Sequence, residues 1–268
     1  MKRFLFFPAY VLLSVTFMLS FISCGGDDAD DTSDVKSNNG NGDKVVIQDA
    51  VFSEGNWICV DIDDIPYFLN SQKRTACVGW PEGYSNIFEG YDFTKYFQKY
   101  YEGGRSWEII VYEQEDYEYR GIIGKIVIPS KIIYRDVEYT VTCIGVETFQ
   151  HQWGITDITI PSTILRIEER ALGDCVGLTK VVIPSSVVYI GYHAFYDEFY
   201  KEKGIKDIYV QRSNPSEYNC DKEAFATVYL DREKDRIFKE CTLHVPVGCK
   251  SKYSNIEPWS KFKKIVEN

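Results

Sequence analysis

The 268-residue sequence lacks the motifs that usually carry catalytic chemistry, and it has only three histidines. His151, His193 and His244 lie in the contexts HQWG, YHAF and LHVP, so none belongs to a metal-binding HExxH motif. The nucleophile elbow GxSxG, the phosphate-binding Walker loop and the dinucleotide-binding GxGxxG motif are also absent. We therefore expect a non-enzymatic protein with no catalytic residues and no cofactor.

The sequence also lacks a CxxC pair, the usual sign of a structural zinc site. Seven cysteines remain besides Cys24, and an odd number argues against a complete disulfide framework. We expect most of them to be small buried hydrophobic residues, although Cys241 and Cys249 could pair across a turn. Asp61, Asp63 and Asp64 lack the glycine and the distal glutamate of a calcium loop, so we interpret them as a solvated turn and expect no metal site.

The first 23 residues predict a lipoprotein signal peptide. Lys2 and Arg3 precede an apolar run over residues 4–22, and Ser23 then places a small residue directly before Cys24. A cysteine in this position can receive a thioether-linked diacylglycerol before cleavage, so lipidation is predicted at Cys24. An uncleaved membrane anchor is disfavoured because the run contains a proline and barely reaches spanning length.

Residues 24–44 predict an acidic, disordered tether. Residues 25–44 contain six aspartates against two lysines, no aromatic residue and one branched aliphatic residue, too little to offset the entropy of ordering. The pattern resembles acid-rich export signals in surface lipoproteins of some Gram-negative bacteria. We expect a lipid-anchored protein of the outer membrane, exposed at the cell surface; a generic periplasmic spacer is the alternative.

The net charge makes nucleic acid an unlikely partner class. The full chain carries a formal charge of −10, and cleavage would remove Lys2 and Arg3, leaving −10 − 2 = −12. An acidic protein repels a polyanion such as DNA.

Internal repeats dominate the second half of the chain. Val141, Ile164 and Val187 are spaced by 23 residues (164 − 141 = 187 − 164 = 23). The same alignment produces four further apolar columns: Ile144, Ile167 and Ile190; Phe149, Leu172 and Phe195; Ile158, Val181 and Ile208; Ile160, Ile183 and Val210. A period in the twenties indicates a solenoid in which each coil buries an apolar face against the next.

The repeat unit resembles the BspA-like leucine-rich repeat family. Its pattern is carried by Leu178, Val181, Ile183, Pro184, Ser185, Val187, Ile190, Gly191, Ala194 and Phe195. The resemblance covers about residues 121–268, including an entry hairpin and a closing segment with its C-terminal cap. Leu172, Glu168 and Arg170 depart from the pattern, and the fourth copy around residues 220–225 looks poorly formed. The resemblance implies a cell-surface protein with an adhesive or protein-binding role.

Residues 45–120 predict a β-rich N-terminal capping region. Residues 57–62 and 66–69 predict a hairpin that covers the first coil. Asp92 is a good N-cap, and aromatic residues then recur with helical spacing: Phe93, Tyr96, Phe97, Tyr100 and Tyr101. This predicts one short aromatic helix over residues 92–102, whose stripe is core or, alternatively, a docking platform for sugars or proteins. The expected fold class is mainly β, a short leucine-rich-repeat solenoid of about 23-residue repeats preceded by this region.

Strand alternation predicts which residues face outward from the presumed concave sheet. The outward column is Val127, Thr159, Val182, Tyr209 and His244, flanked by Lys125, Asp157, Lys180, Asp207 and Thr242. His193 takes a variable repeat position, where a side chain at the coil surface is expected. Solenoids bind partners on such faces, so the column is the candidate site for a host or neighbouring-cell surface or matrix protein.

A second function class is a glycan-binding lipoprotein, or an accessory to an outer-membrane uptake system. Trp80, Trp107 or the stripe over residues 96–101 would then stack on sugar rings. Exposure of these rings distinguishes this class from the protein-binding one.

Overall fold

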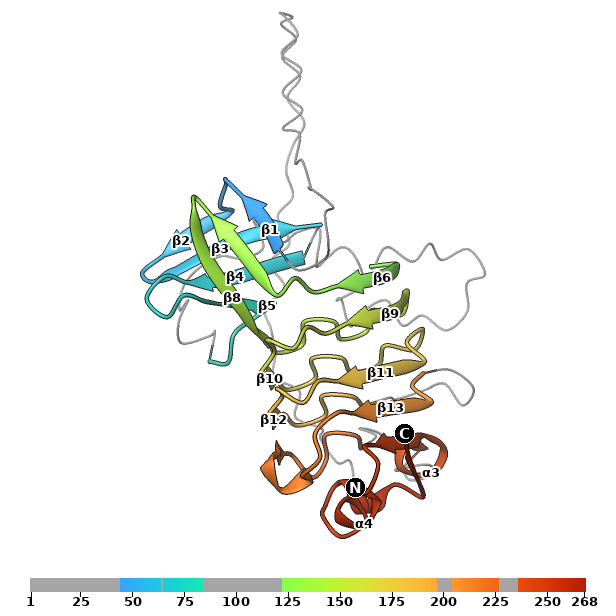
Figure 1. The fold of residues 1–268 in the computed structure, drawn as a ribbon. Helices are drawn as coiled ribbons and strands as arrows, with labels where there is room; N and C mark the ends of the chain where they lie inside the picture. The colour runs from blue at the N-terminus through green and yellow to red at the C-terminus, as the bar shows by residue number, and fades with distance from the viewer. Residues whose placement is uncertain (1–43, 64, 84–121, 197–203, 227–235) are drawn as a thin grey trace, which may run out of the picture. The chain divides into compact units, whose positions relative to one another are not determined.

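The computed structural model describes residues 44–63, 65–83, 122–196, 204–226 and 236–268 (Figure 1). The predicted signal peptide, Cys24, the tether up to residue 43, the aromatic helix over residues 92–102 and Trp107 lie outside the described residues.

The described part of the chain begins with short strands of a mainly β fold. Strand β1 (Lys44–Ile47) is followed by β2 (Phe52–Glu54), β3 (Trp57–Ile62), β4 (Ile65–Asn70) and β5 (Thr75–Val78). Strands β2 to β5 pair antiparallel in sequence order, and β3 and β4 form the predicted hairpin. Asp63, in the turn between them, has a φ of 53°, a left-handed conformation that aspartate tolerates better than most residues.

The first coil of the solenoid is entered through a second hairpin, as expected. Strand β6 (Gly124–Val127) leads to β7 (Lys131–Tyr134) and β8 (Val137–Ile144). Strands β7 and β8 pair antiparallel around Arg135 and Asp136, which both have positive φ values, and β1 pairs parallel to β7.

The N-terminal strands and the coils share one ten-stranded sheet. Strand β5 pairs parallel to β8, and the ladder continues through β10 (Arg166–Ile167), β12 (Tyr189–Ile190) and β14 (Asn219–Cys220). The hairpin region therefore extends the coil sheet edge to edge through β5, an arrangement that the sequence did not predict.

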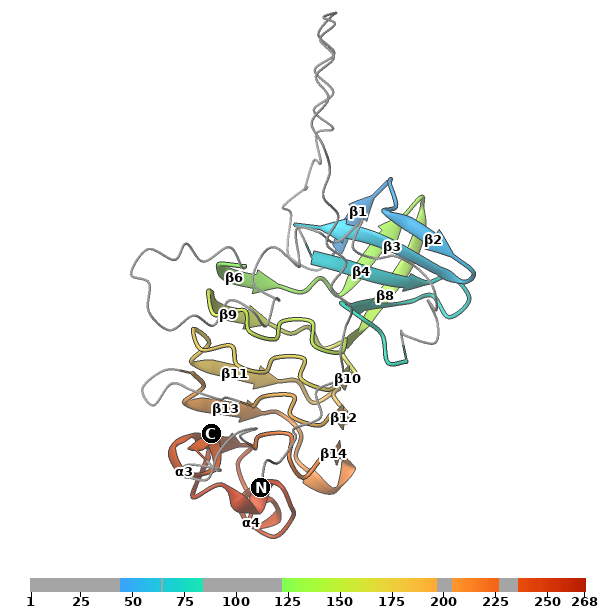
Figure 2. The same ribbon diagram turned by 180° about the vertical axis from the view of Figure 1, so that it is seen from behind.

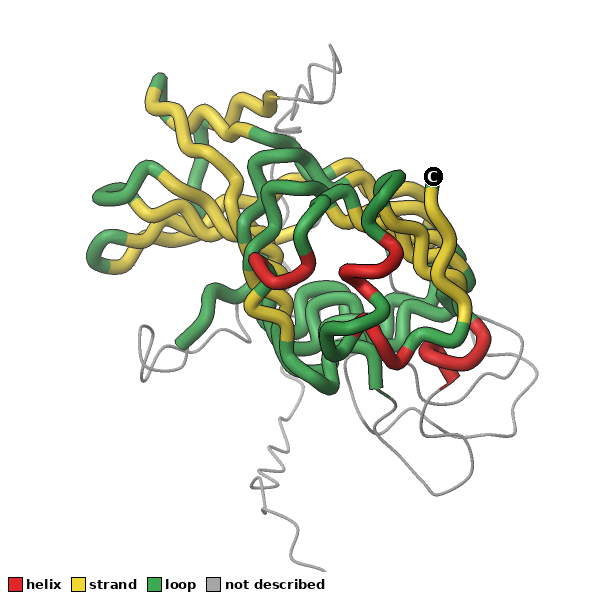
Figure 3. Tube along the Cα trace, turned by 60° about the horizontal axis from the view of Figure 1, so that its bottom comes forward, coloured by secondary structure: helices red, strands yellow, loops and turns green. Residues whose placement is uncertain are grey.

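A second set of parallel strands lies on the opposite side of the coils. Strand β9 (Ile155–Thr159) pairs with β6, and β11 (Lys180–Ile183), β13 (Asp207–Val210), β15 (Thr242–Val245) and β16 (Lys264–Glu267) form a four-stranded sheet. Figures 1 and 2 show these strands stacked one coil after another, with β10, β12 and β14 along the other side. Seen nearly end-on in Figure 3, each coil has strands on two sides and loops between them.

The predicted apolar columns form the core between the two sets of strands. Every member of the five columns is buried, and most are fully buried. This confirms the repeat register and the solenoid. The fourth coil is better formed than its sequence suggests, because Phe225 stacks on Phe195 with ring centroids 5.3 Å apart and Cys220 pairs with Ile190.

Short helices complete the C-terminal end of the solenoid. They are η2 (Pro215–Glu217), α3 (Arg236–Glu240), α4 (Lys250–Tyr253) and η3 (Trp259–Lys261). Trp259, in η3, is fully buried and its ring packs 5.4 Å from that of Phe225. The closing segment therefore covers the apolar interior of the last coil.

Candidate partner-binding surface

The candidate column lies on the outward face of β6, β9, β11, β13 and β15, where strand alternation places it. Val127 and Thr159 are exposed, and Val182, Tyr209 and His244 are partly exposed. Their neighbours along the strands, such as Val181 and Ile183, are fully buried. Cross-strand register aligns Val127 with Thr159, and it aligns Val182, Tyr209 and His244 in one row.

Tyr209 is held between two neighbours in this row. Its ring lies 3.9 Å from that of His244, with an interplanar angle of 8°, and the Lys180 Nζ lies 4.5 Å from the Tyr209 ring centroid. His244 is held in turn, because its Nε2 lies 2.7 Å from Asp207 Oδ1 and its Nδ1 contacts the side-chain amide of Asn268. These contacts fix the aromatic ring in place before any partner arrives.

Charged residues of alternating sign flank the column. Lys125 lies opposite Asp157, and Lys180 lies opposite Asp207, so opposite charges face each other across neighbouring strands. Thr242 continues this flank as the register partner of Asp207, as predicted, but its side chain is buried, with 6% exposed.

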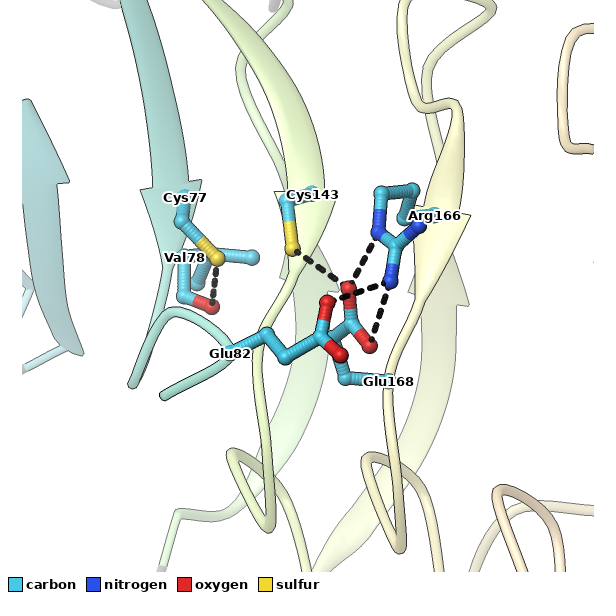
Figure 4. Close-up of polar contacts among 6 residues, drawn as sticks. All are labelled: Cys77, Val78, Glu82, Cys143, Arg166 and Glu168. Carbon is cyan, nitrogen blue, oxygen red and sulfur yellow. Dashed lines mark hydrogen bonds and ion pairs between the residues drawn. The ribbon is translucent and has the colours of Figure 1, made fainter. Parts of the chain in front are cut away.

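A polar cluster lies on the opposite side of the coils, where β5, β8 and β10 meet (Figure 4). Arg166 Nε lies 2.6 Å from Glu168 Oε1, and Arg166 Nη2 lies 2.7 Å from Glu82 Oε2. The Cys143 Sγ–H donates to Glu168 Oε1 over 3.7 Å. In the sequence Glu168 stands out only as a departure from the repeat pattern. Its partners are Arg166, two residues earlier on the same coil, and Cys143 of the preceding coil.

Burial dominates the electrostatics of this cluster. The Glu168 side chain is 3% exposed, and burial raises its pKa although the Arg166 guanidinium opposes the rise. The hydrogen bond to Glu168 raises the pKa of Arg166, whose guanidinium also lies 4.0 Å from the Tyr189 ring centroid. An ion pair in this setting stabilises less than its distance suggests, since both charges lose water.

A third polar network lies at the coil turns. His151 Nδ1 lies 3.1 Å from Asp174 Oδ2, which also accepts from Trp153 Nε1, and His151 Nε2 lies 3.4 Å from the Tyr196 hydroxyl. Gln150 Nε2 donates to that hydroxyl over 2.6 Å. Tyr196 is 2% exposed, so we assign the network a structural role.

The prediction that His193 lies at the coil surface is wrong. His193 is 4% exposed, and its ring stacks on Tyr192 at a centroid distance of 3.6 Å. Burial lowers the pKa of His193, and Arg170 lowers it further against the opposing carboxylates of Glu223 and Asp221.

The cysteines have the expected environment. Cys59, Cys77, Cys175, Cys241 and Cys249 are buried, and Cys143 and Cys220 are partly buried. Cys241 and Cys249 are both free thiols in the structure. The Cys241 Sγ–H donates to the carbonyl of Ile205 over 2.7 Å, and the Cys249 Sγ–H donates to that of Val247 over 3.8 Å.

Trp80, one of the candidate sugar-stacking residues, is 7% exposed. Its ring lies 4.9 Å from that of Phe68, and its backbone bridges to Val146 in the first coil. Trp80 therefore belongs to the core of the N-terminal region.

Comparison with known proteins agrees with the repeat architecture. Residues 142–243 match the family model of the BspA type leucine rich repeat region, in six copies. A search of curated proteins found no match.

Two solved structures illustrate the similarity at low identity. A leucine-rich cell surface protein from Faecalibacterium prausnitzii is 16% identical, with a TM-score of 0.37, over 81% of this chain and 56% of that one. A leucine-rich repeat protein from Bacteroides ovatus is 12% identical, with a TM-score of 0.28, over 78% of this chain and 71% of that one. The chain thus spans little more than half the length of the first of these proteins.

The described helices are all short. None of those in residues 44–63, 65–83, 122–196, 204–226 and 236–268 has the length and apolar character needed to cross a membrane.

Proposed function

Because the chain carries a BspA-type leucine-rich repeat region at residues 142–243, we propose that it is a non-enzymatic surface lipoprotein that binds another protein. The proposed binding surface is the outward face of β11, β13 and β15, centred on Tyr209. The partner class is a surface or matrix protein of a host or a neighbouring cell.

The observation that carries this proposal is the fixed position of the Tyr209 ring. A tyrosine combines a large apolar area with a polar hydroxyl, and such residues dominate the binding energy of protein interfaces. His244 and Lys180 already restrain the Tyr209 ring. Binding would therefore cost less side-chain entropy at Tyr209 than at an unrestrained tyrosine.

The flanking charges support orientation more than affinity. Lys125, Asp157 and Lys180 are exposed, and an exposed ion pair contributes only about 0 to 1 kcal/mol. The alternation of charges from one strand to the next would still select one orientation of a partner and influence the rate of encounter.

The N-terminal segment would present this surface outside the cell. We propose that Cys24 carries the lipid and that the acidic residues 25–44 form a spacer between the outer membrane and the folded chain, with the protein exposed outside the cell. The acid-rich composition of the segment supports this, as does the small residue before Cys24.

The test is a pull-down from matrix and cell-surface proteins with the signal-peptide-free chain, followed by affinity measurements on the partner found. Tyr209→Ala should weaken binding roughly thirty-fold, which corresponds to the ~2 kcal/mol of an interface hot spot. The matched control is Tyr192→Ala, because Tyr192 is an exposed tyrosine at the coil turns.

Charge reversal at the flank tests the proposed orientation. Lys180→Glu and Asp207→Lys should mainly change the association rate and its dependence on salt. If Tyr209→Ala and both reversals leave the affinity unchanged, the binding surface lies elsewhere. A glycan array on the same chain tests the sugar-binding class, which has lost Trp80 as a candidate platform.

A further inference from the structure

Cys143 of the polar cluster and the neighbouring Cys77 lie opposite each other on adjacent strands. In the parallel pairing of β5 with β8, Cys77 is the register partner of Cys143. The register shifts just before this pair, because Ala76 pairs with Val141 and Thr142 is passed over. This irregularity brings Cys143 level with Cys77.

Both thiols lie on the same face of the sheet. The residues on either side of Cys77, Ala76 and Val78, belong to the solenoid core, and so does Ile144 next to Cys143. Because successive side chains of a strand alternate between faces, Cys77 and Cys143 both point away from that core. Figure 4 shows the Cys77 sulfur directed toward the strand of Cys143.

The spacing suits a covalent bond. Neighbouring strands lie about 4.8 Å apart, and disulfides join Cα atoms roughly 4.4 to 6.8 Å apart. The pKa of the Cys77 thiol is raised, first by burial and then by the Cys143 thiol beside it, in accord with this proximity. The two thiols now contact different acceptors, Val78 O at 3.6 Å and Glu168 Oε1 at 3.7 Å, so closure requires rotation of the side chains.

We propose that Cys77 and Cys143 form an intramolecular disulfide when the folded protein meets a small-molecule disulfide such as oxidised glutathione. The bond would join the last N-terminal strand, β5, to the first coil strand, β8.

The difference in exposure sets the order of the steps. Cys143 is partly exposed and Cys77 is buried, so Cys143 reacts first. The Cys143 thiol loses its proton, its sulfur attacks one sulfur of the oxidant, and the first glutathione thiolate leaves. The charged groups beside this thiol are Arg166, the register partner of Cys143 on β10, and Glu168, which accepts from it.

The second step closes the bridge. The Cys77 thiol loses its proton and its sulfur attacks the Cys143 sulfur, which breaks the mixed disulfide and releases the second glutathione thiolate. The two released thiolates take up the two protons that the cysteines lost. The protein is oxidised by two electrons, and one glutathione disulfide is reduced to two thiols.

The register of the sheet explains why this pair is selected. Cys59 pairs with Phe52 and Phe68 on its two sides, and Cys220 pairs with Ile190. These two cysteines have no cysteine as a register partner, and Cys220 resembles Cys143 in its partial burial, so it serves as the control.

The experiment treats the full folded chain with oxidised glutathione, blocks the remaining thiols with iodoacetamide and maps the peptides by mass spectrometry. We expect a linked peptide pair containing Cys77 and Cys143 that dithiothreitol separates. Cys77→Ser should stop the reaction after the first step and trap glutathione on Cys143. Cys143→Ser should leave Cys77 free, and Cys220→Ser should leave the bridge intact.

Thermal unfolding provides a second measurement on the same samples. Oxidation should raise the melting temperature of the unsubstituted chain and of Cys220→Ser, but not that of Cys77→Ser. The proposal is overturned if iodoacetamide still alkylates both Cys77 and Cys143 after the folded chain has been treated with oxidised glutathione. It is also overturned if glutathione stays on Cys143 while Cys77 is present. A bridge between any other pair of cysteines would also overturn it.

Discussion

Three successive coils turn through a residue with a left-handed backbone, and the sequence fills this position without glycine. Glu147, Arg170 and His193 have φ values of 53°, 50° and 52° at equivalent places in three successive repeats. Such a conformation costs an ordinary residue roughly 1 to 2 kcal/mol. Hydrogen bonds between coils offset this cost, since the Glu147 N–H donates to Glu169 O and the Arg170 N–H donates to Tyr192 O. Stacking of the coils therefore imposes the turn.

Glu168 illustrates how a buried charge at one position affects the stability of the whole chain. Its pKa lies above the ordinary value of 4.5, mainly because the side chain is buried. The folded state therefore holds this proton more tightly than the unfolded state does. The contribution of Glu168 to stability is full below pH 4.5 and is lost as the pH rises through the raised pKa.

We predict that Glu168→Gln removes this pH dependence. The melting temperature of the variant relative to the unsubstituted chain should rise between pH 4.5 and pH 7, measured by thermal unfolding monitored by circular dichroism. Glu217→Gln is the control of opposite sign, because the hydrogen bond from Arg212 lowers the pKa of Glu217. The stability that a lowered pKa provides is lost only below pH 4.5, so the relative melting temperature of Glu217→Gln should change little between pH 4.5 and pH 7 and rise as the pH falls below 4.5. A trend shared with Glu168→Gln would contradict the assignment.

At the scale of strands, the alternation of inward and outward side chains organises the solenoid. On β11, Val181 and Ile183 are fully buried while Lys180 is exposed and Val182 is partly exposed. Ile183 pairs with Val210 on β13 and packs in the continuous apolar core. Two adjacent aliphatic residues on one strand thus have different energetic roles.

We predict that Ile183→Ala lowers the free energy of unfolding by roughly 2 to 5 kcal/mol, because it removes buried methyl groups and leaves a cavity. Val182→Ala should cost well under that, since its side chain is partly in solvent. Urea denaturation of both variants measures the difference. Equal losses would show that the two faces of β11 are wrongly assigned.

Much of this architecture could be predicted because it repeats. The apolar columns that contain Val141 and Ile144 recur every 23 residues, and every member of these columns is buried. The pairing of β5 with β8 joins residues more than sixty positions apart through their backbone groups. No pattern of side chains in the sequence therefore predicts it. His193 was misplaced for a related reason, because its cover comes partly from Tyr192 and depends on how the turn is shaped.

The candidate surface was likewise only partly predictable from the sequence. Alternation predicted that Tyr209 and His244 point outward, since each stands between two inward residues of its strand. The stack that fixes them, and the contact of His244 with Asp207, required the register of β13 against β15. Thr242 follows the same alternation but is covered, which a strand pattern cannot reveal.

On the scale of the whole molecule, the chain combines an apolar-cored solenoid with a strongly acidic N-terminal segment. The described strands begin at Lys44, directly after the nineteen residues that follow Cys24. In the function proposed above, a flexible tether of this length would have a root-mean-square span of about 25 Å, which would let the repeat region sample many orientations above a membrane.

We predict that Cys24→Ala releases the protein from the membrane fraction, because it removes the proposed site of lipid attachment. Cell fractionation followed by immunoblotting measures the distribution. Cys220→Ala, which changes a cysteine of the fourth coil, should leave the distribution unchanged. Membrane association that survives the loss of Cys24 would refute the lipoprotein assignment.

The parallel pairing of β5 with β8 leaves neither of these strands with a bare edge along the paired residues. A chain cut so that it begins at the entry hairpin would keep β8 but lose β5, and the N–H and C=O groups of residues 140–144 that face β5 would have no partner. Exposed strand edges recruit other chains, which leads to aggregation. The N-terminal strands thus protect the repeat region against uncontrolled self-association between copies.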